Sequence, residues 1–424
     1  MIVARDGYLK QLIAHRGDGQ VKVITGIRRC GKSFLLHTLF REWLIGQGVP
    51  SEAILVIELD SIRDLRFRDP LVLANFVRGW ASASSDPRYL FVDEIQLSER
   101  VPNPYVKGGE PITFYDALND LRSIPNLDVY VTGSSSRLLA SEIATNFRGR
   151  GDPIRVHPFS FREFHAAVGG EPKEALTRYL RFGGMPQCVT QRDDAERLRY
   201  LRDLVETVYL RDILERRDIR RPEVMARLFD ILCSAIGSLT NPKRLTDAFN
   251  SAWGREGNLS RNTLVSYLDA LRDAFLFTEA ARYDVRGKRY LAFPVKYYCE
   301  DVGLRNARLG FRQTEEPHLL ENIVHNELLI RGYAVDVGVV ESTEGKRCEI
   351  DFIASRGTER LYIQTAFAMP TDAKRAAERR PLRFLDDVFP RIILSNDLPA
   401  PERDPDGILH LPILDFLLHD RLPL

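Results

Sequence analysis

A run of residues near the N-terminus has the composition and spacing of a loop that binds phosphate groups. It fits the pattern GxxxxGK[ST] at every fixed position and reads Gly26, Ile27, Arg28, Arg29, Cys30, Gly31, Lys32, Ser33, with Phe34 next. Glycine permits tight backbone geometry, so successive N–H groups can point at one phosphate. We expect a strand at Val21–Thr25 and a helix at Ser33–Trp43, whose N-terminus adds partial positive charge. The pattern therefore predicts that residues 26–34 bind ATP and ADP; a chance glycine-rich turn is the alternative.

Two side chains of this loop and two later carboxylates have expected chemical roles. Lys32 would reach the β- and γ-phosphates, and the Ser33 hydroxyl would ligate Mg²⁺. The apolar run Tyr89–Val92 leads into Asp93 and Glu94. Asp93 is expected to hold the Mg²⁺ shell, and Glu94 to polarise a water molecule as general base. Acidic strand ends are commonly just solvated, but their position after the phosphate loop favours ATP hydrolysis.

The next strand and the basic pair that follows supply further candidates. In ATPases of this architecture the strand that ends at Thr132 lies between the phosphate-loop strand and the Asp-Glu strand. Thr132 or Ser134 at its tip could orient the attacking water, although serines after strands are also common turn formers. Arg148 and Arg150 could face a neighbouring subunit's ATP and stabilise transition-state charge in trans. The alternative for these arginines is a solvated basic pair near a turn.

Composition narrows the class of protein. Of its residues, 44% are apolar and 28% charged, and the formal net charge of +1 lacks the basic excess of a dedicated nucleic-acid binder. The cysteines contain no CxxC pair, which argues against a zinc ribbon, and their scatter suits a reducing compartment. They are Cys30, Cys188, Cys233, Cys299 and Cys348. With no apolar run near the ~20 residues of a membrane span and no signal-peptide core at the start, we expect a cytoplasmic protein without membrane contact.

The order of apolar patterns predicts three domains. Residues 1–165 alternate strands and helices, which indicates a parallel α/β sheet. Residues 166–310 are mostly helical and end in a hairpin with a basic tip, the description of a winged helix. Residues 311–424 form another α/β unit. The expected strands are Val21–Thr25, Ala53–Leu59, Tyr89–Val92, Val129–Thr132, Ile154–Val156, Phe277–Tyr283, Arg289–Phe293, Ala334–Val340, Arg347–Ala354, Arg360–Thr365 and Arg391–Leu394.

Ten short segments, taken in order, resemble those of a known family. They are GIRRCGKS, FVDEIQ, VTGSSSRLL, FRGR, HPFSFREF, FGGMP, PVKYYCEDVGLRNA, ENIVHNELLIRGY, EIDFIA and YIQTA. The chain resembles prokaryotic AAA-type ATPases, loosely akin to archaeal and signal-transducing ATPases, whose C-terminal half carries a domain of unknown function with a restriction-endonuclease-like core. The resemblance implies ATPase activity, a winged helix and a ring-shaped homo-oligomer, a homohexamer being the first expectation. It also favours Arg150 over Arg148 as the arginine finger, the residue that would reach the ATP of the neighbouring subunit.

The C-terminal domain can be compared with a nuclease pattern. A PD-(D/E)XK nuclease needs an acid on its first helix, an Asp at a strand end, and E-x-K on the next strand. Glu321 and Asp351 fit the first two positions, but Gln364 stands at the Glu position and Ala366 at the Lys position. Alanine removes the cation, so we expect a degenerate nuclease core that does not cleave DNA.

Two classes of function remain open. The first is an ATP-driven machine that acts on a protein partner or on itself through nucleotide-dependent assembly. The second is a DNA-acting ATPase that grips nucleic acid through the nuclease-like domain, a recognition helix at Ser260–Asp273 and a basic wing tip at Arg286–Arg289. A nucleotide-gated defence component is a further alternative. Within the phosphate loop, Cys30 is expected either to be a reactive thiol or to pack beneath the loop.

Overall fold

In the computed structural model, which describes residues 2–134, 151–217, 219–253, 259–312, 315–342 and 345–423, the N-terminal apolar runs form one parallel sheet. Its five strands have the order β2-β3-β4-β1-β5. They are β1 (Val21–Thr25), β2 (Ile54–Glu58), β3 (Arg88–Asp93), β4 (Leu127–Gly133) and β5 (Gly151–Arg155). β4 pairs with both β1 and β3, which confirms the predicted central position of the Thr132 strand.

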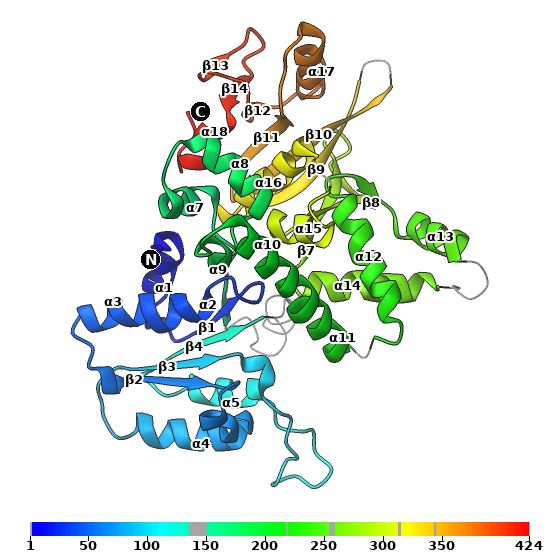
Figure 1. Ribbon diagram of the computed structural model, residues 1–424. Helices are drawn as coiled ribbons and strands as arrows, with labels where there is room; N and C mark the ends of the chain where they lie inside the picture. The colour runs from blue at the N-terminus through cyan, green and yellow to red at the C-terminus, as the bar shows by residue number, and fades with distance from the viewer. Residues whose placement is uncertain are drawn as a thin grey trace. The chain divides into compact units, whose positions relative to one another are not determined.

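Helices cover both faces of this sheet, which explains why strands such as β1 and β4 are buried along their whole length (Figure 1). On one face, Leu73 and Val77 of α4 and Leu118 of α5 pack against strand residues such as Val23 and Val92. On the other face, Phe40 packs against the rings of Phe91 and Tyr130. The helical segments are α1 (Asp6–Ala14), α2 (Lys32–Phe34), η1 (Leu35–Phe40), α3 (Arg41–Gly46), η2 (Ser51–Ala53), η3 (Ile62–Arg68), α4 (Pro70–Ala81), η4 (Ile95–Leu97) and α5 (Phe114–Leu121).

The chain folds into two compact units. The N-terminal unit comprises Ile2–His157 with Asp273–Phe275, and the C-terminal unit comprises Pro158–Arg272 with Leu276–Leu424. The helices of the C-terminal unit are α7 (Phe161–Val168), α8 (Pro172–Phe182), α9 (Pro186–Val189), α10 (Asp194–Asp203), η6 (Leu204–Leu210), α11 (Arg211–Arg217), α12 (Pro222–Ser234), α13 (Pro242–Trp253), α14 (Arg261–Asp273), α15 (Val302–Arg308), α16 (Glu316–Ile330), α17 (Asp372–Arg383) and α18 (Ile413–Leu418).

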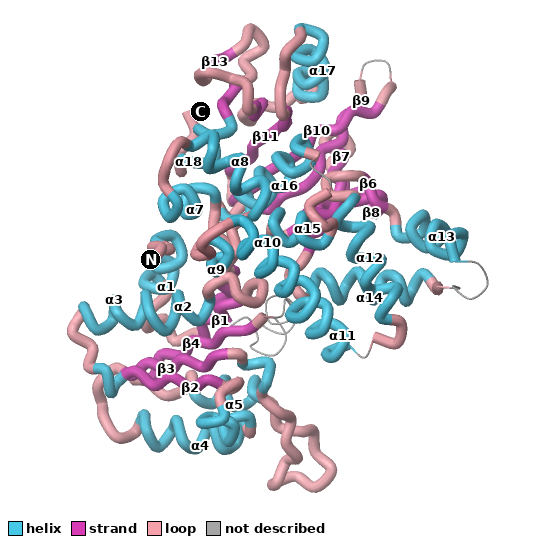
Figure 2. The backbone as a smooth tube through the Cα atoms, viewed as in Figure 1, coloured by secondary structure: helices cyan, strands magenta, loops and turns pink. Residues whose placement is uncertain are grey.

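A mixed sheet of nine strands runs through the C-terminal unit in the order β13-β14-β12-β11-β10-β9-β7-β8-β6. Its strands are β6 (Leu239–Thr240), β7 (Phe277–Asp284), β8 (Arg289–Cys299), β9 (Ala334–Glu341), β10 (Arg347–Arg356), β11 (Glu359–Ala366), β12 (Arg391–Ser395), β13 (Glu402–Arg403) and β14 (Leu409–Pro412). β7 pairs with β9 in parallel, and Figure 2 shows β9, β10 and β11 running alongside one another. The hairpin assigned to the central domain therefore shares a sheet with the strands assigned to the C-terminal domain.

Two of the recognisable segments, FGGMP and PVKYYCEDVGLRNA, fit against each other within the C-terminal unit. Gly183 has a φ of +68°, and a Cβ there would lie 2.1 Å from a carboxylate oxygen of Asp301. A Cβ on Gly303 would lie 2.0 Å from the carbonyl oxygen of Phe182. The Asp301 carboxylate accepts a 2.7 Å hydrogen bond from the N–H of Gly184. Both segments thus need glycine for close packing, which is a structural role.

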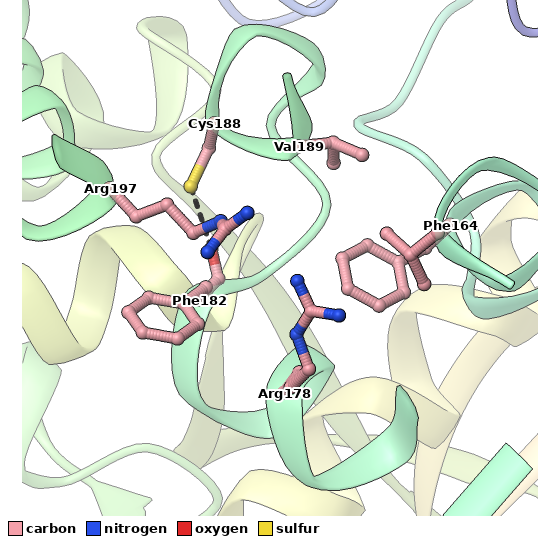
Figure 3. Close-up of a pocket in the computed structure, with 7 residues that line it drawn as sticks. Phe164, Arg178, Phe182, Cys188, Val189 and Arg197 are labelled. Carbon is pink, nitrogen blue, oxygen red and sulfur yellow. Dashed lines mark hydrogen bonds between the residues drawn. The ribbon is translucent and has the colours of Figure 1, made fainter. Parts of the chain in front are cut away.

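A small cavity beside these segments is too small for a substrate. It measures about 10 Å³, roughly the space that one water molecule needs, and Figure 3 shows the side chains around it. The Sγ of Cys188 lies 3.8 Å from the carbonyl oxygen of Phe182, and burial raises the pKa of Cys188 to about 12. The guanidinium of Arg197 lies over the Phe182 ring, 5.9 Å from its centroid. We therefore take the cavity to be a packing feature.

Among the helices that the structure describes, none combines the length and the apolar character that crossing a membrane requires.

Candidate functional site

The loop between β1 and α2 has a backbone that only glycine can adopt at its two ends. Gly26 has a φ of +146°, and a Cβ there would lie 2.0 Å from the carbonyl oxygen of Val156. Gly31 has a φ of +100° and stands immediately before α2. The ammonium group of Lys32 donates to the carbonyl oxygens of Gly26 and Ile27, both at 3.1 Å. The loop therefore curls around the lysine at the N-terminus of a helical segment, a geometry that suits phosphate binding.

Ser33 and Asp93 meet at the carboxyl ends of β1 and β3. The Ser33 hydroxyl donates to Oδ2 of Asp93 at 2.7 Å, and the Thr132 hydroxyl donates to Oδ1. Asp93 is buried, with 7% of its surface exposed. A hydroxyl and a carboxylate this close are the two protein ligands that Mg²⁺ commonly takes beside a nucleotide. The residues present thus fit a magnesium ion.

Glu94 follows Asp93 in a left-handed backbone conformation, with a φ of +53°. Its backbone N–H donates to the Thr132 hydroxyl at 3.1 Å, which links β3 to β4. Its carboxylate accepts a hydrogen bond from the amide of Gln96 and one from the Ser134 hydroxyl at 3.3 Å. The carboxylate is thus held by polar neighbours and is only partly buried. This arrangement can orient a water molecule and accept its proton.

The structure brings together most of the residues that the sequence singled out, and it adds one. Gln96 donates to Glu94 and lies 3.3 Å from the Ser134 hydroxyl. Sequence reasoning missed it, although its position two residues after Glu94 was the available signal. Thr132 contacts Asp93 and the backbone of Glu94, so it positions both acidic residues. Arg148 and Arg150 lie outside the described residues.

The remaining loop positions differ in exposure. Arg28 and Arg29 are exposed, Phe34 is 41% exposed and Ile27 is fully buried. Cys30 is also fully buried, and its Sγ lies 3.3 Å from the carbonyl oxygen of Val156. The expectation of a reactive thiol facing the phosphates is therefore wrong, because the side chain packs beneath the loop. The backbone at Cys30 remains part of the phosphate loop.

In the C-terminal unit, a buried cluster of charges surrounds the nuclease-like positions. The ammonium of Lys296 on β8 lies 2.9 Å from Glu321 on α16 and 2.8 Å from Glu349 on β10. Glu321 also accepts a 2.6 Å hydrogen bond from the hydroxyl of Tyr298. Burial alone would lower the pKa of Lys296, but the neighbouring carboxylates, chiefly Glu321, outweigh it and raise that pKa. The lysine is therefore charged and offsets part of the negative charge of these two acids.

Asp351 on β10 belongs to the same cluster. Its Oδ2 accepts hydrogen bonds from the backbone N–H of Thr365 at 2.7 Å and from the Thr365 hydroxyl at 2.8 Å. The Gln364 amide lies 3.3 Å from Oδ1. The inference that Ala366 deprives this region of a cation is wrong, because Lys296 supplies one. The sheet order, rather than sequence spacing, brings this lysine in from β8.

Two family models match this chain. One described as an AAA domain matches residues 18–165, and one described as a domain of unknown function (DUF8612) matches residues 173–315. An uncharacterized protein of Haemophilus influenzae is 33% identical over 422 residues, which cover 98% of this chain and 99% of that protein. An uncharacterized protein of Methanocaldococcus jannaschii is 26% identical over 403 residues, which cover 89% and 82% respectively.

Solved structures give a weaker likeness. The ORC1 protein of Aeropyrum pernix in complex with DNA aligns with a TM-score of 0.30 and 12% identity, covering 73% of this chain and 93% of that one. A DNA polymerase III gamma subunit-related protein of Thermotoga maritima aligns with a TM-score of 0.29 and 13% identity, covering 63% and 99%. Scores this low carry no argument about what this chain binds.

Proposed function

We propose that this chain, which belongs to one family with the uncharacterized Haemophilus influenzae protein and carries an AAA domain, is a Mg²⁺-dependent ATPase. The observation that carries the proposal is the 2.7 Å contact between the Ser33 hydroxyl and Asp93, beside a loop that wraps Lys32. A hydroxyl, a carboxylate and a lysine in this arrangement supply what a nucleoside triphosphate and its metal need.

Each residue of the site has a separate task. The loop N–H groups and Lys32 bind the phosphates, and Ser33 and Asp93 hold the metal, which when bound offsets the phosphate charge. Glu94 takes the proton of the attacking water, and Ser134 and Gln96 keep its carboxylate oriented. Thr132 positions the Asp93 carboxylate and the Glu94 backbone through the two hydrogen bonds of its hydroxyl.

The proposed use of ATP is assembly or motion that acts on a protein partner. Two ion pairs weigh against the DNA-acting alternative. Arg286 at the hairpin tip lies 3.7 Å from Asp386, and Arg289 lies 3.6 Å from Asp284. The carboxylates of Asp386 and Asp284 lower the positive charge that the hairpin tip presents to a phosphodiester backbone. We propose that α12, α13, α14 and the β7–β8 hairpin form a winged helix and that it serves packing.

Two substitutions test the ATPase. Lys32→Ala should weaken nucleotide binding, whereas Glu94→Gln should leave ATP bound with little turnover, a loss on the order of a hundredfold or more. Glu99→Gln is the matched control, because Glu99 is an exposed carboxylate a few residues further along. Phosphate release and retained nucleotide are measured on the same samples. Full turnover by Glu94→Gln would show that another group acts as the base.

A further inference from the structure

A second cavity lies in the N-terminal unit, at the edge of the sheet opposite the phosphate loop. It measures about 350 Å³ and is lined by residues at the start of β3 and β4 and by the segment before β1. The phosphate loop follows the carboxyl end of β1, so the cavity is distinct from the proposed nucleotide site. Its size falls at the small end of the range for pockets that bind small molecules.

Arg16, Arg88 and Arg122 line this cavity. None of them forms an ion pair with any carboxylate among the residues that the structure describes. The Nε atoms of Arg88 and Arg122 are buried and make no hydrogen bond there. Burying a guanidinium N–H without a partner is costly, so these two N–H groups are donors that no residue in the described part of the chain satisfies.

Two of these guanidinium groups are held in place by aromatic rings. The Cζ of Arg88 lies 4.6 Å from the centroid of the Trp80 ring on α4. The Cζ of Arg16 lies 5.4 Å from the Trp43 ring on α3. Stacking of this kind fixes the plane of a guanidinium and leaves its edge available for hydrogen bonds, and Arg16 also interacts with the hydroxyl of Tyr89 in the wall of the cavity. The cavity is thus a prearranged basic site.

The acid that lines the cavity is already satisfied by other groups. Oδ1 of Asp128 accepts from the buried ammonium of Lys22 at 2.6 Å. Its Oδ2 accepts from the N–H of Gly17 at 2.9 Å and from the hydroxyl of Tyr130 at 2.8 Å. Nearby Asp18 also pairs with Lys22. These carboxylates therefore do not neutralise the three arginines.

We propose that this cavity binds a small molecule bearing a phosphate group, recognised by Arg16, Arg88 and Arg122. A phosphate monoester carries nearly two negative charges at neutral pH and accepts several hydrogen bonds, which matches converging guanidinium forks. A carboxylate carries one negative charge and accepts fewer hydrogen bonds from these guanidinium groups. This site does not depend on the proposed ATPase activity.

The test measures pyrophosphate binding by calorimetry in the Lys32→Ala background, where the phosphate loop is weakened. Pyrophosphate should bind, and Arg88→Gln or Arg122→Gln should weaken binding by about tenfold or more, the loss expected for a charged hydrogen bond. Arg122→Lys keeps the positive charge but not the planar guanidinium, so it should lose less pyrophosphate affinity than Arg122→Gln. Circular dichroism establishes that each variant is folded.

Arg66→Gln is the matched control. Arg66 is an exposed arginine of the same unit that stacks over the rings of Phe67 and Phe76, away from the cavity. Its substitution should leave pyrophosphate affinity unchanged. Competition by ADP at the Arg122-dependent site would identify a nucleotide as the ligand, and failure to compete would identify a simpler phosphate. Absence of binding, or equal affinity in the Arg88, Arg122 and Arg66 variants, would overturn the proposal.

Discussion

The ammonium group of Lys296 lies 2.9 Å from Oε1 of Glu321, on a strand and a helix that the fold of the C-terminal unit brings together. The side chain of Lys296 is only 5% exposed and that of Glu321 only 11%. Glu349 completes the contact on the other side of the ammonium. Where the nuclease pattern calls for a metal between acids, this chain places its own cation.

Removing that cation should destabilise the C-terminal unit. Lys296→Met leaves the buried carboxylate of Glu321 and the 31% exposed carboxylate of Glu349 without their partner, and breaking a buried pair such as Lys296–Glu321 costs about 3–5 kcal/mol. Urea unfolding of the variant and the wild type gives the difference. Lys243→Met is the control, because Lys243 is an exposed lysine on α13. A loss no larger than that of the control would mean that the buried acids become protonated at little cost.

The stability of the same unit should depend on the protonation of Asp351. Burial, followed by the charge of Glu321, raises the pKa of Asp351 from its ordinary 3.8 to about 7, while Lys296 and Thr365 oppose the rise. The folded state therefore holds the proton more tightly than the unfolded state. The stabilisation is complete below the unfolded pKa and is lost as pH rises through about 7.

Asp351→Asn stays neutral and should lack this dependence. The stability of the wild type relative to Asp351→Asn should therefore fall as the pH rises from about 4 to about 7 and level off above that, as measured by urea midpoints. Asp386→Asn, which changes a 79% exposed carboxylate, should show no such trend. A difference between wild type and Asp351→Asn that stays constant with pH would place the titration elsewhere.

Sequence patterns predicted those parts of the molecule that depend on residues adjacent in the sequence. β1, which reads VKVIT, has the predicted bounds because a parallel strand buried on both faces is mostly apolar, and its lysine, Lys22, is buried by pairing with Asp18 and Asp128. The phosphate loop was recognisable because its glycines, Lys32 and Ser33 are adjacent in sequence. The role of Lys296 was not recognisable from the sequence, because its partners lie on α16 and β10. Only the order of strands in the sheet brings β8 near those two elements. Short edge strands such as β13 carry exposed polar residues, and no apolar pattern marks them.

The cysteines should react at very different rates. Cys348 is partly exposed, whereas Cys30, Cys188, Cys233 and Cys299 are buried. Burial also raises the pKa of Cys299 to about 12, which suppresses the reactive thiolate. In the native protein a thiol reagent should therefore modify one site quickly, and Cys348→Ser should abolish that fast phase. Rapid modification of Cys30, found by peptide mapping, would show that the phosphate loop opens.

Arg150 is predicted to act on a neighbouring subunit's ATP. Arg150→Ala should lower turnover on the order of a thousandfold, the scale of an arginine finger. Lys32→Ala subunits are inactive but still carry Arg150, so mixing them with Arg150→Ala subunits should partly restore hydrolysis. Subunits that carry both substitutions are the control and should restore none. Full activity of a monomer would exclude a finger in trans.

The last prediction is that the C-terminal unit does not cleave DNA. A two-carboxylate nuclease site holds its metal beside the scissile phosphate and uses a lysine to assist the attacking water. Here Lys296 lies between Glu321 and Glu349, so it pairs with one of the two acids that a metal would need, Glu321. Both hydrogen bonds from Thr365 engage one oxygen of Asp351, which is itself only 8% exposed. Lys296 and Thr365 thus already engage the two carboxylates, Glu321 and Asp351, that a metal would need.

Supercoiled and single-stranded DNA are therefore expected to stay intact with Mg²⁺ or Mn²⁺, with or without ATP. Asp351→Asn should leave both the DNA and ATP turnover unchanged, since it removes charge from a cluster in the C-terminal unit rather than from the phosphate loop. Glu94→Gln is assayed in parallel. Nicking that depends on this chain's ATP hydrolysis should disappear in that variant, whereas nicking by a contaminating nuclease should persist. Nicking that copurifies with the chain and disappears in Asp351→Asn would contradict the prediction. In that case Lys296 would be the lysine of an active site, and Lys296→Met would have to abolish the nicking as well.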